Sequence, residues 1–111
     1  MKIYSSKYSN QFDKYAGKDI WVKVRSNNHS NYFYIKVLYT EGDNVVCNSA
    51  LSDYIESPIN DVSIKWEDLV NYLSTQYTFY IPDLTIVHPV QTFTYEELIE
   101  EISANYTIDY T

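Results

Sequence analysis

The side chains in this sequence with the greatest capacity for chemistry are carboxylates in two similar stretches, SIKWEDLVNYL at 63–73 and TFTYEELIEEI at 92–102. They are Glu67, Asp68, Glu96, Glu97, Glu100 and Glu101. The second stretch contains no lysine or arginine to balance its four glutamates. Grouped carboxylates of this kind can coordinate a metal ion, exchange a proton or contact a basic partner.

Metal binding and catalysis find little support in the other residue types. No aspartate-rich loop has calcium-binding spacing, and a single cysteine, Cys47, excludes a CxxC zinc site. Cys47 lies in the apolar run NVVCN, which favours a small buried hydrophobic residue over a reactive thiolate. Two histidines, His29 and His88, and two glycines provide neither a general base with its partners nor a phosphate-binding glycine loop. The sequence therefore predicts no catalytic residue, no metal and no cofactor.

Charge is divided unevenly along the chain. Residues 1–40 hold seven lysines and arginines against two aspartates, whereas residues 41–111 hold only Lys65 against thirteen acidic residues. The two parts carry +5 and −12, which gives the net charge of −7. Either the two parts fold against each other and partly cancel, or the acidic part forms an interaction surface.

Alternating polar and apolar residues predict a series of strands that would position these side chains. The strands are expected at 19–25, 31–39, 44–50, 77–81, 84–88 and 106–110. The first three form an antiparallel meander with a turn at Gly42, and the alternation places Tyr39 on the same face as Val37. A short helix is expected around 8–16, with Gly17 as its C-terminal stop.

Each of the two similar stretches predicts an amphipathic helix whose acidic residues lie opposite an apolar stripe. The stripes are Trp66, Leu69, Val70 and Leu73 in the first stretch and Tyr95, Leu98, Ile99 and Ile102 in the second. Thr94 and Glu97 have the spacing of a capping box. Two helix starts of similar design, or a true internal repeat, would each explain the likeness. Together the elements predict a single α+β domain over 1–111, in which an antiparallel, strongly curled sheet packs with two amphipathic helices.

A second candidate surface combines basic and aromatic side chains on one face of the first two strands. It consists of Trp21, Lys23, Arg25, Tyr32, Tyr34 and Lys36. Basic residues on such a face can follow phosphates while the rings stack on bases. The net charge of −7 opposes the approach of a nucleic acid, and lysines on strands also serve simply as solvated positions that protect sheet edges.

Composition gives the expected location. No apolar segment is long enough for a signal-peptide core or a membrane helix, so we expect a cytoplasmic protein with no membrane partner. Asn, Ile, Lys and Tyr, the last occurring 13 times, are residues with AT-rich codons. They indicate an AT-rich genome such as that of a phage or another mobile element, which would place the protein in the host cytoplasm.

On these grounds we expect a small, acidic, non-enzymatic protein that binds a protein partner with a basic surface through the six carboxylates. It would be an accessory protein or inhibitor that covers a basic, nucleic-acid-handling host protein as a DNA mimic. One alternative is a nucleic-acid-binding module that uses the basic and aromatic face. Another is a structural or assembly subunit that self-associates through its basic and acidic parts.

Overall fold

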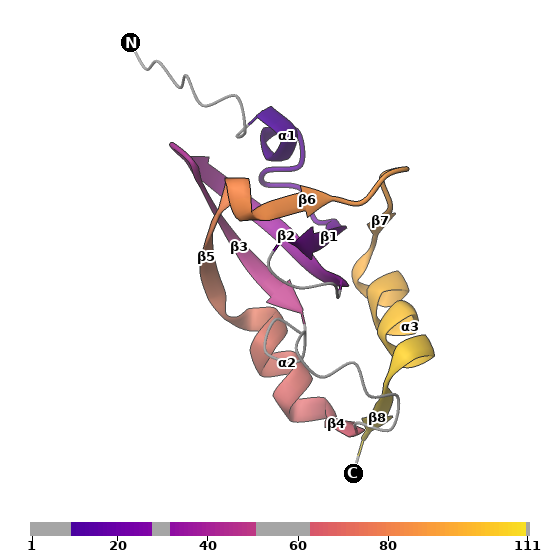
Figure 1. Cartoon of the computed structure of the whole chain (residues 1–111). Helices are drawn as coiled ribbons and strands as arrows, with labels where there is room; N and C mark the ends of the chain where they lie inside the picture. The colour runs from indigo at the N-terminus through magenta and orange to yellow at the C-terminus, as the bar shows by residue number, and fades with distance from the viewer. Residues whose placement is uncertain (1–9, 28–31, 51–62, 111) are drawn as a thin grey trace.

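The computed structural model describes residues 10–27, 32–50 and 63–110, and it has the predicted α+β architecture with an antiparallel sheet (Figure 1). The elements are α1 (Asn10–Asp13), β1 (Trp21–Ser26), β2 (Tyr32–Glu41), β3 (Asn44–Ala50), β4 (Ser63–Lys65), α2 (Trp66–Ser74), β5 (Gln76–Tyr80), the 3₁₀ helix η2 (Ile81–Asp83), β6 (Leu84–Ile86), β7 (Thr92–Phe93), α3 (Tyr95–Asn105) and β8 (Thr107–Asp109). The two predicted amphipathic helices are α2 and α3.

The first three strands form the predicted antiparallel meander, in which β1 pairs with β2 and β2 with β3. Gly42 has a φ of 62° in the turn between β2 and β3, a conformation that glycine adopts without steric cost. Val37 lies opposite Cys47 in β3, but the register then shifts and Tyr39 lies opposite Val46. Because neighbouring residues of β3 point to opposite faces, the prediction that Tyr39 shares the face of Val37 is wrong.

Among the described residues the larger sheet has six strands, in the order β5-β3-β2-β1-β6, and β7 also pairs with β1. β6 lies along Val24–Ser26 and β7 along Trp21–Val22, so these two short strands share one edge of β1. A separate small sheet joins β4 and β8 in parallel. The predicted C-terminal strand is therefore present, but its partner β4 has only three residues, too few to show a period in the sequence.

The two edge strands of the larger sheet are connected by η2 alone. A flat sheet with five strands in a row would hold β5 and β6 about 19 Å apart. The link from Tyr80 to Leu84 spans at most roughly 14 Å, so the sheet must bend until its edges approach each other at this end. The sheet is not closed, because β5 and β6 do not pair within the described part of the chain. Strong curling along its whole length stays a prediction.

The first helix is shorter than predicted. α1 ends at Asp13, and turns continue to Gly17, which has the positive φ of 75° expected of a C-terminal stop. The Gly17 N–H donates a hydrogen bond to the carbonyl of Val37 (3.1 Å), which fixes this segment against β2. Residues 8 and 9 of the predicted helix lie outside the described residues.

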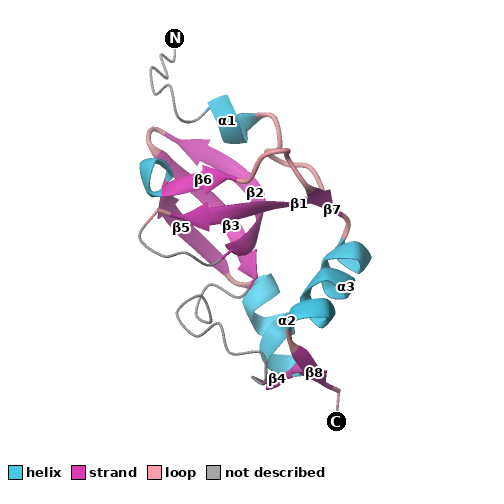
Figure 2. Cartoon of the chain, turned by 45° about the vertical axis from the view of Figure 1, so that its right-hand side comes forward, coloured by secondary structure: helices cyan, strands magenta, loops and turns pink. Residues whose placement is uncertain are grey.

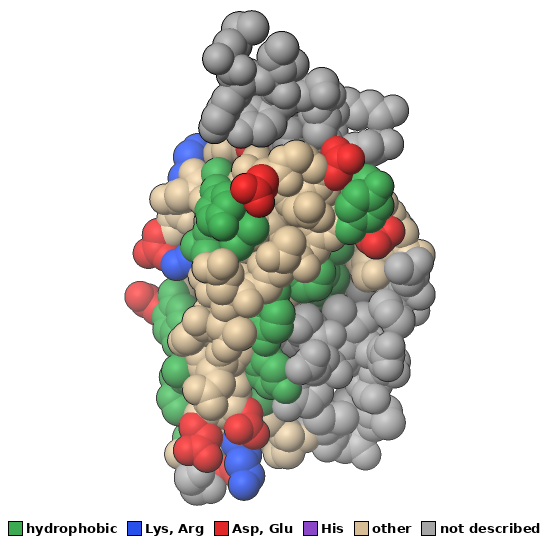
Figure 3. Space-filling view, turned by 90° about the vertical axis from the view of Figure 1, so that its left-hand side faces the viewer, with side chains coloured by type: hydrophobic (Ala, Val, Ile, Leu, Met, Phe, Trp, Pro, Cys, Tyr) green, Lys and Arg blue, Asp and Glu red, His purple; other side chains and the backbone are tan. Residues whose placement is uncertain are grey.

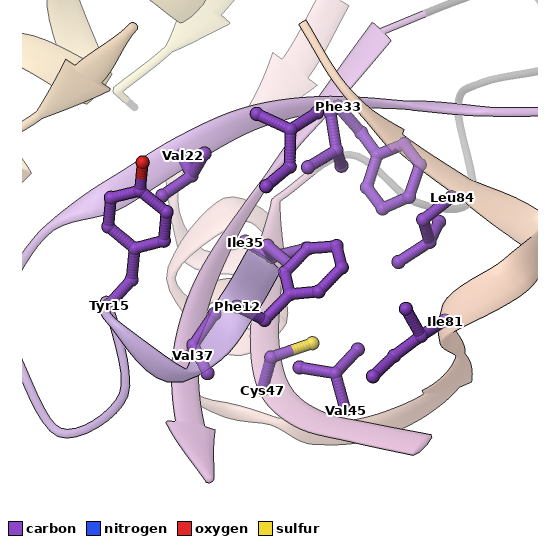
Figure 4. Close-up of a cluster of buried hydrophobic side chains, with 12 residues drawn as sticks. Phe12, Tyr15, Val22, Phe33, Ile35, Val37, Val45, Cys47, Ile81 and Leu84 are labelled. Carbon is purple, nitrogen blue, oxygen red and sulfur yellow. The ribbon is translucent and has the colours of Figure 1, made fainter. Parts of the chain in front are cut away.

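One face of the sheet is covered by α1, the turns after it and η2. The buried side chains of this first cluster are Phe12, Tyr15, Val22, Val24, Phe33, Ile35, Val37, Val45, Cys47, Ile81, Leu84 and Ile86. Figure 4 shows the labelled members of the cluster pointing toward one another from the strands and from the segments next to them. Cys47 is fully buried here, which confirms the prediction of a small hydrophobic residue, and burial raises the pKa of its thiol to about 12.

The opposite face is covered by α2 and α3, which lie near one end of the sheet in Figure 2 while α1 lies near the other. The buried members of this second cluster are Trp21, Tyr34, Ala50, Ile64, Leu69, Leu73, Leu98 and Ile102. Each predicted helical stripe is thus confirmed at one buried pair, Leu69 and Leu73 in α2 and Leu98 and Ile102 in α3. Tyr95, which was predicted to belong to the stripe of α3, is exposed.

Candidate protein-binding surface

The start of α3 is fixed by the predicted capping box. The Thr94 hydroxyl accepts a hydrogen bond from the Glu97 backbone N–H (3.2 Å), and a Glu97 carboxylate oxygen accepts one from the Thr94 N–H (2.9 Å). The corresponding residue before α2 is Lys65, whose side chain makes no capping bond. The likeness of the two stretches therefore extends to a short strand before each helix but not to the cap, and it does not decide whether the stretches are a repeat.

Glu101 is not part of an exposed acidic face. It accepts a hydrogen bond from the Tyr34 hydroxyl (2.9 Å) and lies 3.5 Å from the Lys23 ammonium, with 26% of its side chain exposed. Lys23 and Tyr34 are cross-strand partners in β1 and β2, so both side chains project from the same face and meet the carboxylate. Burial, and then the hydrogen bond to Glu101, raise the pKa of Tyr34 above its ordinary value.

This contact answers part of the question raised by the divided charge. Lys23 belongs to the basic part of the sequence and Glu101 to the acidic part, and their ion pair joins β1 to α3. The Lys23 ammonium also lies 4.7 Å from the centre of the Tyr32 ring. The two parts of the chain therefore fold against each other and partly cancel, as one of the two interpretations expects.

The remaining carboxylates of α3 face solvent. Glu96, Glu97 and Glu100 are exposed, and Glu97 is engaged by the capping box. Within the described residues, Glu96 and Glu100 make no ion pair and no side-chain hydrogen bond. They are one helical turn apart, an arrangement that costs an isolated helix about 0.2–0.5 kcal/mol. α3 thus presents negative charge that the described fold does not use.

The carboxylates of α2 lie elsewhere. Glu67 and Asp68 are exposed in the first turn of α2, which begins at Trp66. The centre of the Trp66 ring lies 5.4 Å from that of Tyr110. Tyr110 follows the C-terminal end of α3, whereas Glu96 lies at its N-terminal end, and a helix of this length spans about 16 Å. Figure 1 shows the two helix starts far apart. Because charges are screened over about 8 Å at physiological salt, the six predicted residues do not form one surface.

The basic and aromatic face of the alternative is largely covered. Only 2% of Trp21 and 4% of Tyr34 is exposed, because both rings lie under the helices in the second cluster. The prediction that these two rings are available to stack on bases is therefore wrong. Lys36 lies 3.5 Å from Asp19, and Lys23 is paired with Glu101. Arg25 and Tyr32 are the two members that remain exposed.

A feature that sequence reasoning missed is the position of β5. The run YTFYI at 77–81 predicts a strand, and β5 forms there as QYTFY, but its place at one edge of the sheet becomes visible only in the strand order. Gln76, Thr78 and Tyr80 are exposed, and 51% of Tyr80 is accessible. Figure 3 looks onto the side of the molecule where β5 and α2 lie, and hydrophobic side chains are visible there between acidic groups towards the two ends. The absence of charge in the run was the available signal.

Other kinds of site find no counterpart in the described ranges. No three His, Cys, Asp or Glu residues there form a group that could hold a metal ion. No described helix has the length and apolar character needed to cross a membrane. Comparisons of the chain with protein-family models, with curated proteins and with solved structures gave no match.

Proposed function

We propose that the chain is a non-enzymatic protein-binding protein, and that the exposed side of α3 contacts a partner with a basic surface. The observation that carries this proposal is the pair Glu96 and Glu100. Both are exposed and lack a cation among the described residues, while Lys23, which contacts α3, is engaged by Glu101. A basic partner would supply the missing cations.

The construction of α3 favours a specific contact. The capping box fixes its first turn, and the bond from Tyr34 to Glu101 fixes its rotation on the sheet. The exposed carboxylates are therefore held in one arrangement before a partner arrives, which lowers the entropy lost on binding. Contacts between such carboxylates and a basic partner accelerate association and weaken as the salt concentration increases.

The finer proposal is a DNA mimic that covers a basic, nucleic-acid-handling protein of a host cell. Glu96 and Glu100 are separated by a rise of about 6 Å along α3. The two carboxylates therefore repeat negative charge along one face of a helix, as phosphates repeat it along a DNA strand. The composition, rich in residues with AT-rich codons, supports an origin in a phage or mobile element.

A retention experiment with matched variants tests the proposal. The tagged protein is incubated with a bacterial lysate, either untreated or treated with nuclease, and washed at low and at high salt. Glu96→Gln/Glu100→Gln removes the two unpaired charges of α3, and Glu67→Gln/Asp68→Asn removes two exposed charges from α2. Each pair of substitutions changes the net charge from −7 to −5. The design leaves Glu97 and Glu101 intact, since both support the fold.

The proposal expects a basic protein that is retained at low salt, is released at high salt and is lost from the α3 variant alone. Equal retention by both variants would mean that the α3 carboxylates are only a solvated surface. Retention that disappears after nuclease treatment would instead favour nucleic-acid binding through Arg25 and Tyr32.

A further inference from the structure

The outer side of β5 carries backbone groups that no described strand pairs with. β5 pairs with β3 from Gln76 to Tyr80 without a register shift, and it ends the strand order on its other side. The N–H and C=O groups of an edge strand can bind another extended chain. Proteins usually prevent this with charged side chains, proline, bulges or very short strands. None of these features occurs within QYTFY.

The opposite edge of the same sheet is protected. β6 and β7 have three and two residues, and the segment between them includes the exposed residues His88, Pro89 and Val90. A chain that approached this edge would meet two short strands with an interruption and a proline between them. The contrast within one small sheet indicates that the open edge at β5 is a property of that strand and not of the fold as a whole.

The side chains of β5 form an apolar surface next to the open edge. Tyr77 and Phe79 are half-buried on one face, with ring centres 6.2 Å apart. Phe79 also packs against the first cluster, with its ring 5.6 Å from that of Phe33. An apolar side chain on an added strand would pack across these rings, as cross-strand neighbours do, and would extend the first cluster outward.

Acidic side chains lie near the Tyr80 end of β5, where η2 leads the chain away from the edge towards β6. Tyr80 lies opposite Asn44, and the next residue, Ile81, donates its N–H to the carbonyl of Asp43 (2.8 Å). Asp83 is two residues further on, and Glu41 pairs with Asn44 across the turn. All three carboxylates are exposed, and none has an ion pair among the described residues.

The negative charge near Tyr80 favours one kind of added strand over another. A lysine or arginine on an added strand would be attracted by the carboxylates near this end and by the face of the exposed Tyr80 ring. Glu41 would contribute least, because β3 and β5 lie between it and the added strand. A second copy of this chain carries the same acids and a net charge of −7. Two β5 strands paired with each other would bring no cation to either acidic group, so like charge opposes self-pairing.

We propose that the open edge of β5 binds an extended segment of another protein, which adds to the sheet as a strand and carries alternating apolar side chains with a lysine or arginine at the end beside Tyr80. This surface is separate from α3. The inference therefore stands or falls independently of the proposed function, and variants of β5 and of α3 distinguish the two.

The test is a selection from a display library of random nine-residue peptides on the full-length protein. The best selected peptide is then synthesised and titrated while backbone amide NMR shifts are recorded. Thr78→Lys places a charge in the middle of β5, and Thr92→Lys places the same charge on the opposite edge as the matched control. Both threonines are exposed, so neither change disturbs a buried contact. A peptide N-methylated at alternate residues serves as the backbone control.

The selected peptides are expected to alternate apolar residues and to end in lysine or arginine. The largest shifts should fall at residues 76–80, and both Thr78→Lys and N-methylation should weaken binding by about tenfold or more, because each blocks pairing at the strand edge. Thr92→Lys should bind as the wild type does. Absence of enrichment, shifts centred elsewhere, or undiminished binding of the N-methylated peptide would overturn the proposal. A concentration-dependent dimer that Thr78→Lys dissolves would identify a second copy as the occupant and would also overturn it.

Discussion

The exposed side of α3 and the open edge of β5 present different kinds of contact to a partner. α3 offers carboxylates on a helix, while β5 offers backbone groups and aromatic rings, with acids at one end. Attraction to the α3 carboxylates falls as salt rises. Hydrogen bonds and ring packing along a strand depend far less on salt. Salt should therefore weaken binding at α3 more than binding at β5, where charge contributes only at the Tyr80 end.

The two surfaces also rest on different parts of the interior. α3 is held by Leu98 and Ile102 in the second cluster and by the contact of Glu101 with the sheet. β5 is held by its pairing with β3 and by Phe79 against the first cluster. Because the clusters lie on opposite faces of the sheet, each surface can be perturbed without removing the support of the other.

The largest effect is expected from Leu98→Ala, which deletes a fully buried side chain of the second cluster. The free energy of unfolding should fall by about 2–5 kcal/mol, as measured by urea denaturation. Hydrogen exchange should show that amides of α3 lose more protection than those of β5. Ile35→Val in the first cluster is the control and should cost about 0.5–1.5 kcal/mol. Equal loss of protection in α3 and β5 would contradict separate support.

The second prediction concerns alkaline pH. Burial raises the pKa of Cys47 from 9.0 to about 12, so between these values the folded protein keeps a proton that the unfolded chain loses. The contribution is complete below pH 9 and should fall by about 1.4 kcal/mol for each pH unit above it. Urea titrations from pH 9 to 11 should show a shallower decline for Cys47→Ala than for the wild type. Parallel declines would show that this thiol is not protected in the folded state.

The third prediction concerns the contact that joins α3 to the sheet. Tyr34→Phe keeps the buried ring but removes the hydroxyl that donates to Glu101. The expected loss is about 1–3 kcal/mol in the free energy of unfolding at neutral pH. Tyr39→Phe removes an exposed hydroxyl and should change stability by less than about 0.5 kcal/mol. If the two variants are equally stable, the bond to Glu101 contributes little to the position of α3.

The smallest expected change in stability comes from the residues that precede α3 and α2. Thr94→Ala removes the capping box of α3 and should cost about 1 kcal/mol. Lys65→Ala changes the same position before α2, where the side chain makes no capping bond, and should leave stability within about 0.5 kcal/mol. Thermal denaturation followed by circular dichroism measures both. A larger loss for Lys65→Ala would contradict the difference between the two starts.

The parts of α3 that depend on neighbouring residues could be predicted from the sequence. The capping box joins residues three apart, and the buried pair Leu98 and Ile102 lies one turn apart. The meander was visible for a similar reason, since alternation along a strand is local. β4 and β7 could not be predicted, because two or three residues are too few to define a period.

The candidate site was harder to predict, because it depends on contacts between distant residues. Glu101 meets Tyr34 and Lys23, which precede it by 67 and 78 positions. The helical period assigned Glu101 to the outer face, but it could not show that α3 crosses β1 and β2 at this carboxylate. Alternation likewise placed Trp21 and Tyr34 on one face of the sheet without showing that helices cover that face.

The central claim is that the unpaired carboxylates of α3 bind a basic partner. Its most direct test is the amount of basic protein retained by the wild type, by Glu96→Gln/Glu100→Gln and by Glu67→Gln/Asp68→Asn at the same low salt concentration. The account predicts that retention falls for the α3 variant and persists for the α2 variant, although both have the same net charge. Equal retention by all three proteins would contradict it.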